Sequence, residues 1–214
     1  MTVSPETPAR FRWLPIRALG PRHRSRIAAH LLQLSADDRY LRFGYPASDE
    51  HIGRYVDQID FDHDEVFGVF NRRLELVAVA HVAYLGGDQP GSAEFGVSVL
   101  PSGRGRGMGS RLFERACLHA RNRGIDHLIV HALSENTAML KIARHAGATL
   151  GREGADATAV LKLPPEDFGS HWSQLVETQA GEIDYGLKLQ AARLDRLVQQ
   201  VRDFMPGGGP TAGD

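Results

Sequence analysis

The stretch GRGRGMGSR, residues 103–111, contains four glycines and three arginines and leads into a helix-like sequence. Glycine has no Cβ, so its amide can approach a ligand closely, and the first N–H groups of a helix carry a partial positive charge. Successive amides in such a turn can surround phosphate oxygens. The residue types therefore predict an anion-binding turn at the start of a helix.

Two common phosphate-binding motifs do not match this turn. A Walker loop ends in Gly-Lys-Ser/Thr, whereas Gly107 is followed by Met108. The Rossmann fingerprint requires glycine or alanine five residues after its first glycine, and counting from Gly105 this position is Ser110. We therefore do not expect a P-loop or a dinucleotide fold.

The elements around the turn follow from hydrophobic periodicity and from turn and capping residues. We expect strands at 10–19, 65–71, 74–85, 93–100, 127–133 and 158–163, and helices at 23–34, 37–46, 48–60, 108–123 and 134–147. Hairpin-connected strands precede the turn and helices alternate with strands after it, which predicts an α/β (α+β) fold with a mixed sheet. The strand at 74–85 lacks strict alternation, so we expect it to be central and covered on both faces.

Composition limits the function classes. The chain has 214 residues, 42% of them hydrophobic, and a net charge of −1, which predicts one sizeable domain without a general affinity for nucleic acid or an anionic membrane. No apolar run is long enough to span a membrane, and the N-terminus lacks the apolar core of a secretory signal. Acidic residues are absent from Thr7 to Ala36, as in a transit peptide, but this region has a strand and helix pattern. We therefore expect a cytoplasmic protein.

The C-terminal region differs in composition. We expect residues 1–164 to form the main domain, 165–205 a helical extension and 206–214 a disordered tail. Two rows with heptad spacing run along the extension, Ile183, Gln190, Leu197 and Phe204 in one and Leu187, Leu194 and Val201 in the other. This stripe can pair two chains in a homodimer or pack against its own domain, and the sequence leaves both open.

Arg-x-x-Gly-x-Gly occurs at Arg104, Gly107 and Gly109, directly after Val97-x-Val99. With this motif the chain resembles the GCN5-related N-acetyltransferases (GNAT), and the resemblance implies a mostly antiparallel mixed sheet flanked by helices. The blocks DDRYLRFG, AEFGVSVLPSGRGRGMG and SENTAMLKIARHAGA are similar to the acetyltransferase domain of bacterial Pat-type protein lysine acetyltransferases. The alternative interpretation of the motif is a glycine-rich turn with solvated arginines.

The resemblance implies a set of binding residues and acetyl-CoA as cosubstrate, with no metal. Val97 and Val99 would offer backbone groups to the pantetheine arm, and Asn136 would meet the pantetheine or its sulfur end. The pyrophosphate would be held mainly by the amides of Arg104, Gly105, Arg106, Gly107, Met108 and Gly109. Ser98, between the valines, is expected to be structural.

The acceptor must lose a proton before it can attack a thioester. A lysine with a pKa near 10.4 is neutral in roughly one molecule in 2500 at neutral pH. By resemblance to Pat-type enzymes Glu94 is the candidate base, the alternative being an exposed strand glutamate. Gly96 suggests a bulge that would change which way Glu94 faces. Where many family members carry a tyrosine as general acid, this chain has Ala143.

The resemblance and the residues that carry it together imply an N-acetyltransferase that moves an acetyl group directly to a primary amine. A protein lysine is the first choice of acceptor, on the Pat-type resemblance; the alternatives are a small-molecule amine or a non-catalytic acyl-CoA sensor. No covalent intermediate is expected, because no activated nucleophile can be identified. The only cysteine, Cys117, lies at helical spacing from apolar residues and is expected to pack in the core.

Other conspicuous residues have less specific surroundings. The segment DFDHDE at 60–65 is interpreted as a solvated turn and not as a metal site around His63. His81 and His131 fall on predicted strands and are expected to be hydrogen-bonded core histidines. Tyr40 and Phe43 are spaced for one helix face and are assigned to pocket or core without a choice between them.

Overall fold

The computed structural model describes residues 15–87 and 89–164. The described strands are β1 (Arg17–Leu19), β2 (Glu65–Phe70), β3 (Leu76–Leu85), β4 (Ser92–Val99), β5 (His127–Leu133), β6 (Thr149–Glu153) and β7 (Asp156–Lys162). They form one sheet in the order β1-β2-β3-β4-β5-β7-β6. Every neighbouring pair is antiparallel except β4 and β5, which are parallel. The predicted mixed, mostly antiparallel sheet is confirmed.

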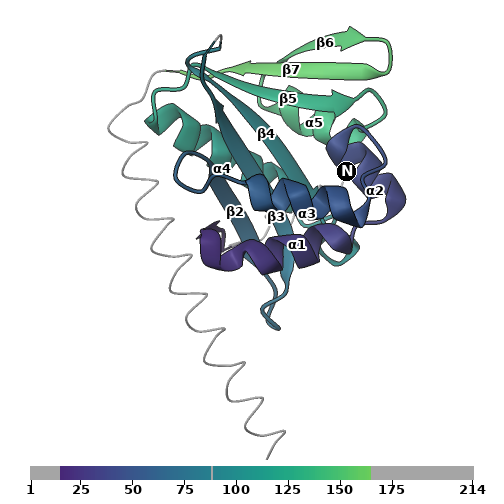
Figure 1. Cartoon of the computed structure of the whole chain (residues 1–214). Helices are drawn as coiled ribbons and strands as arrows, with labels where there is room; N and C mark the ends of the chain where they lie inside the picture. Colours follow the sequence, from purple (N-terminus) through teal and green to yellow (C-terminus); the bar gives the residue numbers. More distant parts are fainter. Residues whose placement is uncertain (1–14, 88, 165–214) are drawn as a thin grey trace, which may run out of the picture.

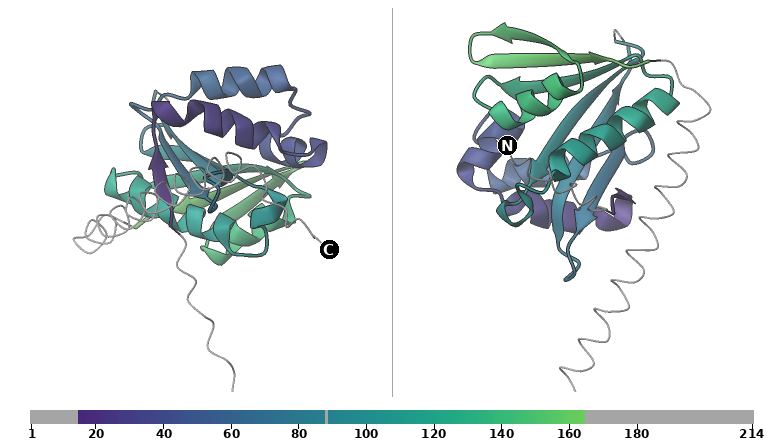
Figure 2. Two further views of the ribbon diagram at one scale, coloured as in Figure 1. Left: turned by 90° about the horizontal axis from the view of Figure 1, so that it is seen from below. Right: turned by 180° about the vertical axis from the view of Figure 1, so that it is seen from behind.

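Helices cover both faces of this sheet. The described helices are η1 (Pro21–His23), α1 (Arg24–Leu32), α2 (Ala36–Phe43), α3 (Asp49–Gln58), η2 (Pro101–Gly103), α4 (Met108–Asn122) and α5 (Thr137–His145). Helices α1 and α3 lie on one face, and α4 and α5 lie on the other (Figures 1 and 2). Helix α2 lies beside the sheet, where it contacts β4 and β5.

Each face of the sheet has its own hydrophobic core. Phe95 of β4 packs edge-on against Phe113 of α4 in the first core, with ring centroids 5.0 Å apart. Ile27 of α1 and Ile52 of α3 are fully buried in the second. Burial of one such side chain stabilises the fold by about 1.5–3 kcal/mol. Strand β3 contributes to both cores, so its predicted central position is confirmed.

The strands β4 and β5 separate partway along their length. Their pairing runs from Ser92 opposite His127 to Glu94 opposite Ile129, and it ends there. On its other side β4 pairs with β3 in one unbroken register, so the bulge expected at Gly96 is wrong for this pairing. From residue 95 onward β4 therefore has a free edge facing the gap between the two strands.

Side-chain hydrogen bonds hold the helices beside this gap. Helix α2 is capped at its start by Ser35, whose side chain accepts from the Asp38 N–H, and at its end by Gly44, whose φ of 80° is left-handed. Arg39 ties α2 to its neighbours by donating to Leu32 O at 2.8 Å and to Asp49 Oδ1 at 2.6 Å.

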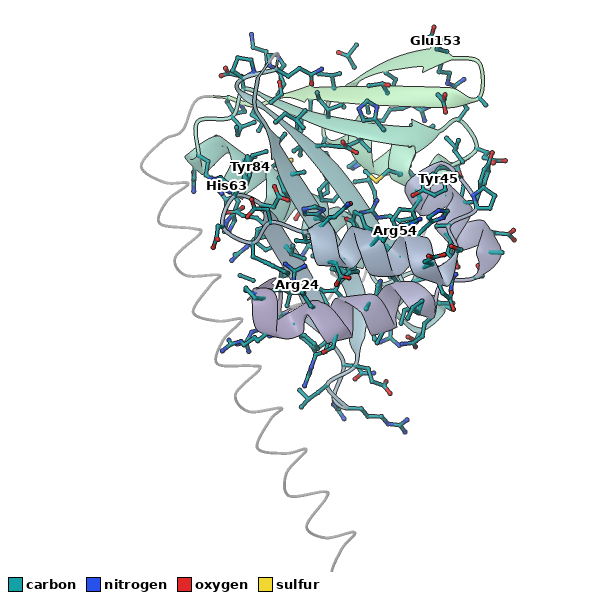
Figure 3. All side chains as sticks on the ribbon, in the orientation of Figure 1. Arg24, Tyr45, Arg54, His63, Tyr84 and Glu153 are labelled. Atoms are coloured by element: carbon teal, nitrogen blue, oxygen red, sulfur yellow. The ribbon has the colours of Figure 1, made fainter. Side chains whose placement is uncertain are left out.

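Arg24, labelled in Figure 3, fastens α1 to the end of α3 by donating to Ile59 O at 2.8 Å. The helical layer is therefore fixed by side chains that do not line the gap.

Three parts of the predicted organisation differ from the structure or lie outside it. The sequence analysis missed β6, which forms a hairpin with β7. Four of the five β6 residues are exposed, so the strand carries no hydrophobic alternation. Of the strand expected at 10–19, Arg17–Leu19 is confirmed and residues 10–14 lie outside the described chain. The helical extension and the tail also lie outside it.

Within residues 15–87 and 89–164, none of the helices has the length and apolar character needed to cross a membrane.

Candidate active site

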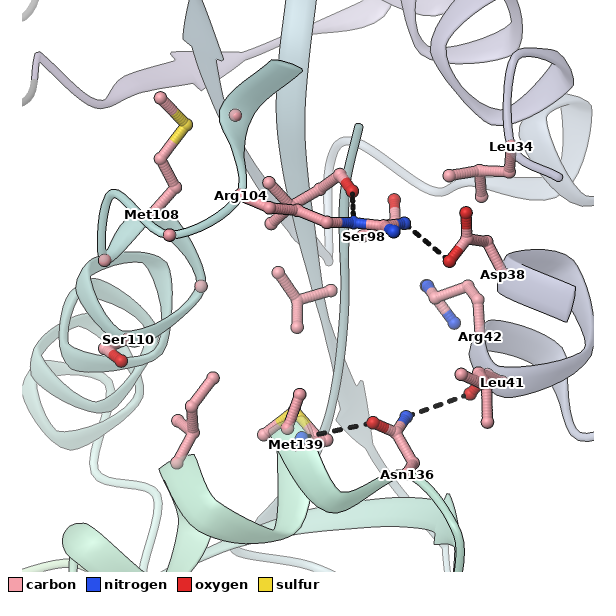
Figure 4. A pocket seen from close by; sticks show the side chains of 18 residues that line it. Leu34, Asp38, Leu41, Arg42, Ser98, Arg104, Met108, Ser110, Asn136 and Met139 are labelled. Atoms are coloured by element: carbon pink, nitrogen blue, oxygen red, sulfur yellow. Dashed lines mark hydrogen bonds and ion pairs between the residues drawn. The ribbon is translucent and has the colours of Figure 1, made fainter. Parts of the chain in front are cut away.

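A cavity of about 450 Å³ lies between the end of β4, the start of α4, and helices α2 and α5 (Figure 4). It brings together most of the residues that the sequence singled out. Those lining it are Val97, Val99, Arg104, Gly105, Gly107, Met108, Gly109 and Asn136. Arg106 and Glu94 do not line it. The residues from strand, turn and second helix thus meet in one place.

The start of α4 supplies backbone amides to this cavity. Gly107 precedes the helix with a φ of 73° and provides no side-chain cap. Gly105 also has a positive φ of 70°. Because L side chains disfavour this conformation, both positions favour glycine, and the uncapped N–H groups remain available to an anion.

The free edge of β4 forms the adjoining wall. Val97 and Val99 line the cavity, and both lie beyond the last β4–β5 pair at Glu94. An extended ligand can add to such an edge by strand-like hydrogen bonds. The cavity therefore joins an anion site to a strand edge.

Asn136 lies where α5 approaches α2. Its Oδ1 accepts from Met139 N at 3.1 Å, which caps α5, and its Nδ2 donates to Leu41 O at 3.2 Å. Both ends of the amide are thus engaged within the protein, and Asn136 holds two walls of the cavity together.

Arg104 extends across the cavity toward α2 (Figure 4). Its Nη2 lies 2.5 Å from Asp38 Oδ1, and its Nε donates to Val99 O at 3.2 Å. Burial alone would raise the pKa of Asp38, but hydrogen bonds from Arg104 and Ser35 outweigh it and lower that pKa. Asp38 was missed by the sequence analysis, since a helix acid has no signal that predicts a partner 66 residues away.

A hydrogen-bonded chain of four side chains leads from the cavity into the protein. Arg42 lines the cavity and donates from Nη2 to the Tyr55 hydroxyl at 2.9 Å. Tyr55 in turn lies 2.8 Å from His81 Nδ1, and His81 Nε2 lies 2.9 Å from Asp64 Oδ2. Burial lowers the pKa of His81 more than Asp64 raises it. A neutral His81 then donates to Asp64 and accepts from Tyr55.

The structure places the two histidines that were predicted to lie on strands in different environments. His81 is hydrogen-bonded through both ring nitrogens, as expected. The expectation for His131 is wrong, because this residue is exposed on β5. Position on a strand does not reveal which face of the strand is covered.

A second polar pair, not anticipated from the sequence, connects the cavity to α1. His30 is 1% exposed, with Nδ1 2.8 Å from Leu76 O and Nε2 2.8 Å from Ser98 Oγ. A carbonyl only accepts, so Nδ1 carries the proton and Nε2 accepts from the Ser98 hydroxyl. Burial lowers the pKa of His30 to about 4. Ser98 lines the cavity but its hydroxyl is directed to His30, which agrees with a structural role.

Glu94 lies on β4 just before the strands part. It is exposed and pairs with Ala83. Strand alternation puts it on the same face as Ser98, toward the α1 and α3 layer, and its charge acts on His81. The candidate base thus lies near His81, which belongs to the hydrogen-bonded series of side chains that starts at Arg42 in the cavity.

The remaining candidates are accounted for by packing or turns. Ala143 is fully buried in the first core, and burial raises the pKa of the Cys117 thiol to about 12. His63 is exposed in a turn with Nδ1 2.7 Å from Asp60 Oδ2. Phe43 packs against Tyr55 with ring centroids 5.3 Å apart and, like Tyr40, does not line the cavity.

In the part of the chain that is described, no group of three potential ligands that could hold a metal occurs.

The sequence matches one family of known proteins. The family model described as "Acetyltransferase (GNAT) family" matches residues 21–148, more than half of the chain. No curated protein matches the sequence significantly.

Three solved structures illustrate the similarity of fold. The GNAT domain of S. lividans PAT matches with a TM-score of 0.60 and 24% identity, over 69% of this chain and 89% of that one. An acetyltransferase of the GNAT family from Streptococcus pneumoniae matches with a TM-score of 0.57 and 16% identity, over 71% and 100%. Ribosomal-protein-alanine N-acetyltransferase from Brucella melitensis matches with a TM-score of 0.52 and 18% identity, over 69% and 99%. At these identities the likeness supports the fold alone.

Proposed function

The chain belongs to the acetyltransferase (GNAT) family, as its motifs predicted, and on this basis we propose that it transfers an acetyl group from acetyl-CoA directly to a primary amine. One observation carries the proposal: the uncapped amides at the start of α4 and the free edge of β4 line one cavity. A diphosphate joined to an extended pantetheine arm is the chemistry that these two surfaces would take.

The residues present suit this donor. The amides of residues 104–109 would hold the diphosphate, and the backbone at Val97 and Val99 would hold the pantetheine. Arg106 is exposed outside the cavity lining, so its part would be limited to its amide and to charge near the surface. When bound, the donor supplies an activated acyl carbon; the protein positions it and manages the protons.

Glu94 would accept the proton of the incoming ammonium, directly or through water. The neutral amine nitrogen then forms the C–N bond, the C–S bond breaks with its electron pair on sulfur, and the second nitrogen proton passes to that thiolate, directly or through water. Glu94 is exposed, which suits a base that must return its proton to solvent after each turnover.

We propose a protein lysine as acceptor. The support is the similarity of three sequence blocks to the acetyltransferase domain of Pat-type protein lysine acetyltransferases. A small-molecule amine is the other acceptor class that the test must include. A cytoplasmic location and a homodimer through the C-terminal region stay predictions.

The experiment measures free CoA thiol released from acetyl-CoA in the presence of lysine-containing proteins, peptides and small amines. The wild type should release thiol with at least one acceptor, and Glu94→Gln should reduce kcat while leaving the donor Kd unchanged. Glu153→Gln is the matched control, because Glu153 is an exposed strand glutamate on β6 (Figure 3). Donor binding without thiol release for any acceptor would instead indicate an acyl-CoA sensor.

A further inference from the structure

Two arginines line the cavity, and they differ in their partners. Arg104 is paired with the carboxylate of Asp38. Arg42 makes no ion pair with a carboxylate anywhere in residues 15–87 and 89–164, and its buried Nε has no hydrogen-bond partner there. Arg42 therefore brings a positive charge to the cavity wall that the described part of the protein does not neutralise (Figure 4).

The position of this charge is fixed from behind. Nη2 donates to Tyr55, which is held by His81 and, through it, by Asp64. The guanidinium carbon also lies 5.1 Å from the Phe43 ring centroid and 5.5 Å from that of Tyr55, within the range of cation–π attraction. The phenol and the two aromatic rings are uncharged, so they restrict the conformational freedom of the Arg42 side chain without neutralising its charge.

Gly96 makes room for the guanidinium against β4. A Cβ at position 96 would lie 2.5 Å from Arg42 Nη2 and 2.6 Å from Cζ. Gly96 is two residues beyond Glu94, the last β4 residue paired with β5. The charge thus sits where the free edge of β4 begins, next to the candidate base.

We propose that Arg42 stabilises the negative charge that develops on the thioester during acyl transfer. This inference rests on the proposed function. As the amine nitrogen, already neutralised by Glu94, attacks, the carbonyl electron pair moves to oxygen; when the carbonyl reforms and the C–S bond breaks, the pair leaves on sulfur, and the second nitrogen proton passes to that thiolate, directly or through water. Arg42 keeps its protons throughout, because a guanidinium does not deprotonate in proteins.

The other polar side chains that line the cavity are engaged within the protein or, like Ser110, lie at the start of α4 beside the amides assigned to the diphosphate. Ala143 is buried in the core, so α5 offers no acid at that position. The Ser98 hydroxyl donates to His30, and the Asn136 amide is used by Met139 and Leu41. Preorganised donors aimed at developing charge are among the largest contributions to catalysis, and Arg42 is the cavity cation that has no carboxylate partner in the described residues.

The first test replaces the charge. Arg42→Gln should lower kcat for thiol release by about 100-fold and change the donor Kd little, since the charge acts mainly in the transition state. Arg42→Lys should retain part of the activity, and added guanidinium ion should partly restore Arg42→Ala. Arg54→Gln is the matched control, because Arg54 is exposed on α3 beside Tyr55 and should behave as wild type.

The second test moves the same charge without removing it. Gly96→Ala should displace the flexible end of Arg42 and lower kcat in the same direction. In the Arg42→Gln background, Gly96→Ala should have little further effect, because both changes act on one group.

The outcomes separate this inference from the proposed function. Thiol release by the wild type with unchanged kcat in Arg42→Gln would overturn the role of Arg42 and leave the function intact. A weaker donor Kd with unchanged kcat would also overturn it, since Arg42 would then only bind the donor. Absence of thiol release by the wild type with every acceptor would overturn both. Should Arg42→Gln fail to fold, an unchanged kcat in folded Gly96→Ala would overturn the inference, and a reduced kcat would support it.

Discussion

The guanidinium of Arg104 and the carboxylate of Asp38 close one side of the cavity, with 2.5 Å between Nη2 and Oδ1. Arg104 belongs to the turn before α4, and Asp38 belongs to α2, so this ion pair connects the anion-binding turn to the opposite wall. Both residues line the cavity. A diphosphate bound at the turn would compete with Asp38 for Arg104.

Asp38→Asn should therefore tighten acetyl-CoA binding. Ion pairs of this exposure contribute about 0.2–1 kcal/mol, which corresponds to a Kd about 1.5- to 5-fold lower once the competitor is removed. Calorimetric titration at low and high salt measures the change, which should shrink at high salt. Weaker binding in Asp38→Asn would contradict competition and indicate that the pair preorganises Arg104.

Gly107→Ala should weaken donor binding by more than it weakens the fold. A left-handed conformation costs a non-glycine residue about 1–2 kcal/mol, and here the strain falls on the amides that would hold the diphosphate. Gly154→Ala is the control, because Gly154 has a φ of 61° in the β6–β7 hairpin. Equal donor affinity in the two variants would count against the anion-binding turn.

Asn136→Ala should destabilise the protein by about 1 kcal/mol through loss of the α5 cap, and should also weaken donor binding. The second effect follows from loss of the hydrogen bond to Leu41, which holds α2 against α5 at the cavity. Ser48→Ala removes the cap of α3, which does not line the cavity, and should lower stability alone. Denaturant unfolding and titration separate the two effects; unchanged affinity in Asn136→Ala would contradict the clamp.

Acidification should destabilise the fold through His30. Burial lowers the pKa of His30 from 6.5 to about 4, so between these values the unfolded chain binds a proton that the folded chain does not. The free energy of unfolding is unaffected above this window and falls as pH falls through it, by about 3 kcal/mol in total.

Urea unfolding at a series of pH values should show a shallower decline for His30→Gln. The decline should not vanish, because the pKa of His23 is also lowered to about 4 by burial and by Arg17. His145→Gln replaces an exposed histidine and should keep the wild-type slope. An unchanged slope in His30→Gln would show that His30 is not the group that titrates.

Cys117 should react only slowly with thiol reagents in the folded protein. Burial raises the pKa of its thiol to about 12, so almost no thiolate is present at neutral pH. Ellman's reagent should modify Cys117 slowly under native conditions and rapidly in urea, so released CoA can be measured without a background. Fast modification of the native protein would show that this part of α4 opens.

The local features of the site could be predicted from the amino-acid sequence alone. Glycines at 105 and 107 permit the left-handed turn, Asn136 caps its helix, and the Arg-x-x-Gly-x-Gly motif pointed to the family that the family model confirms. Such features depend on residues close together in the chain, and therefore they leave a readable pattern.

Which distant side chains surround the cavity depends on the packing of the whole fold and could not be predicted from the sequence. Arg42 and Asp38 lie on a helix more than fifty residues before Gly96 and Arg104, and no periodicity connects them. Nor could the sequence exclude a bulge at Gly96, because a glycine in a strand accommodates either a bulge or a neighbouring side chain. The guanidinium that fills this space arrives from α2, whose position depends on the packing of the whole helical layer.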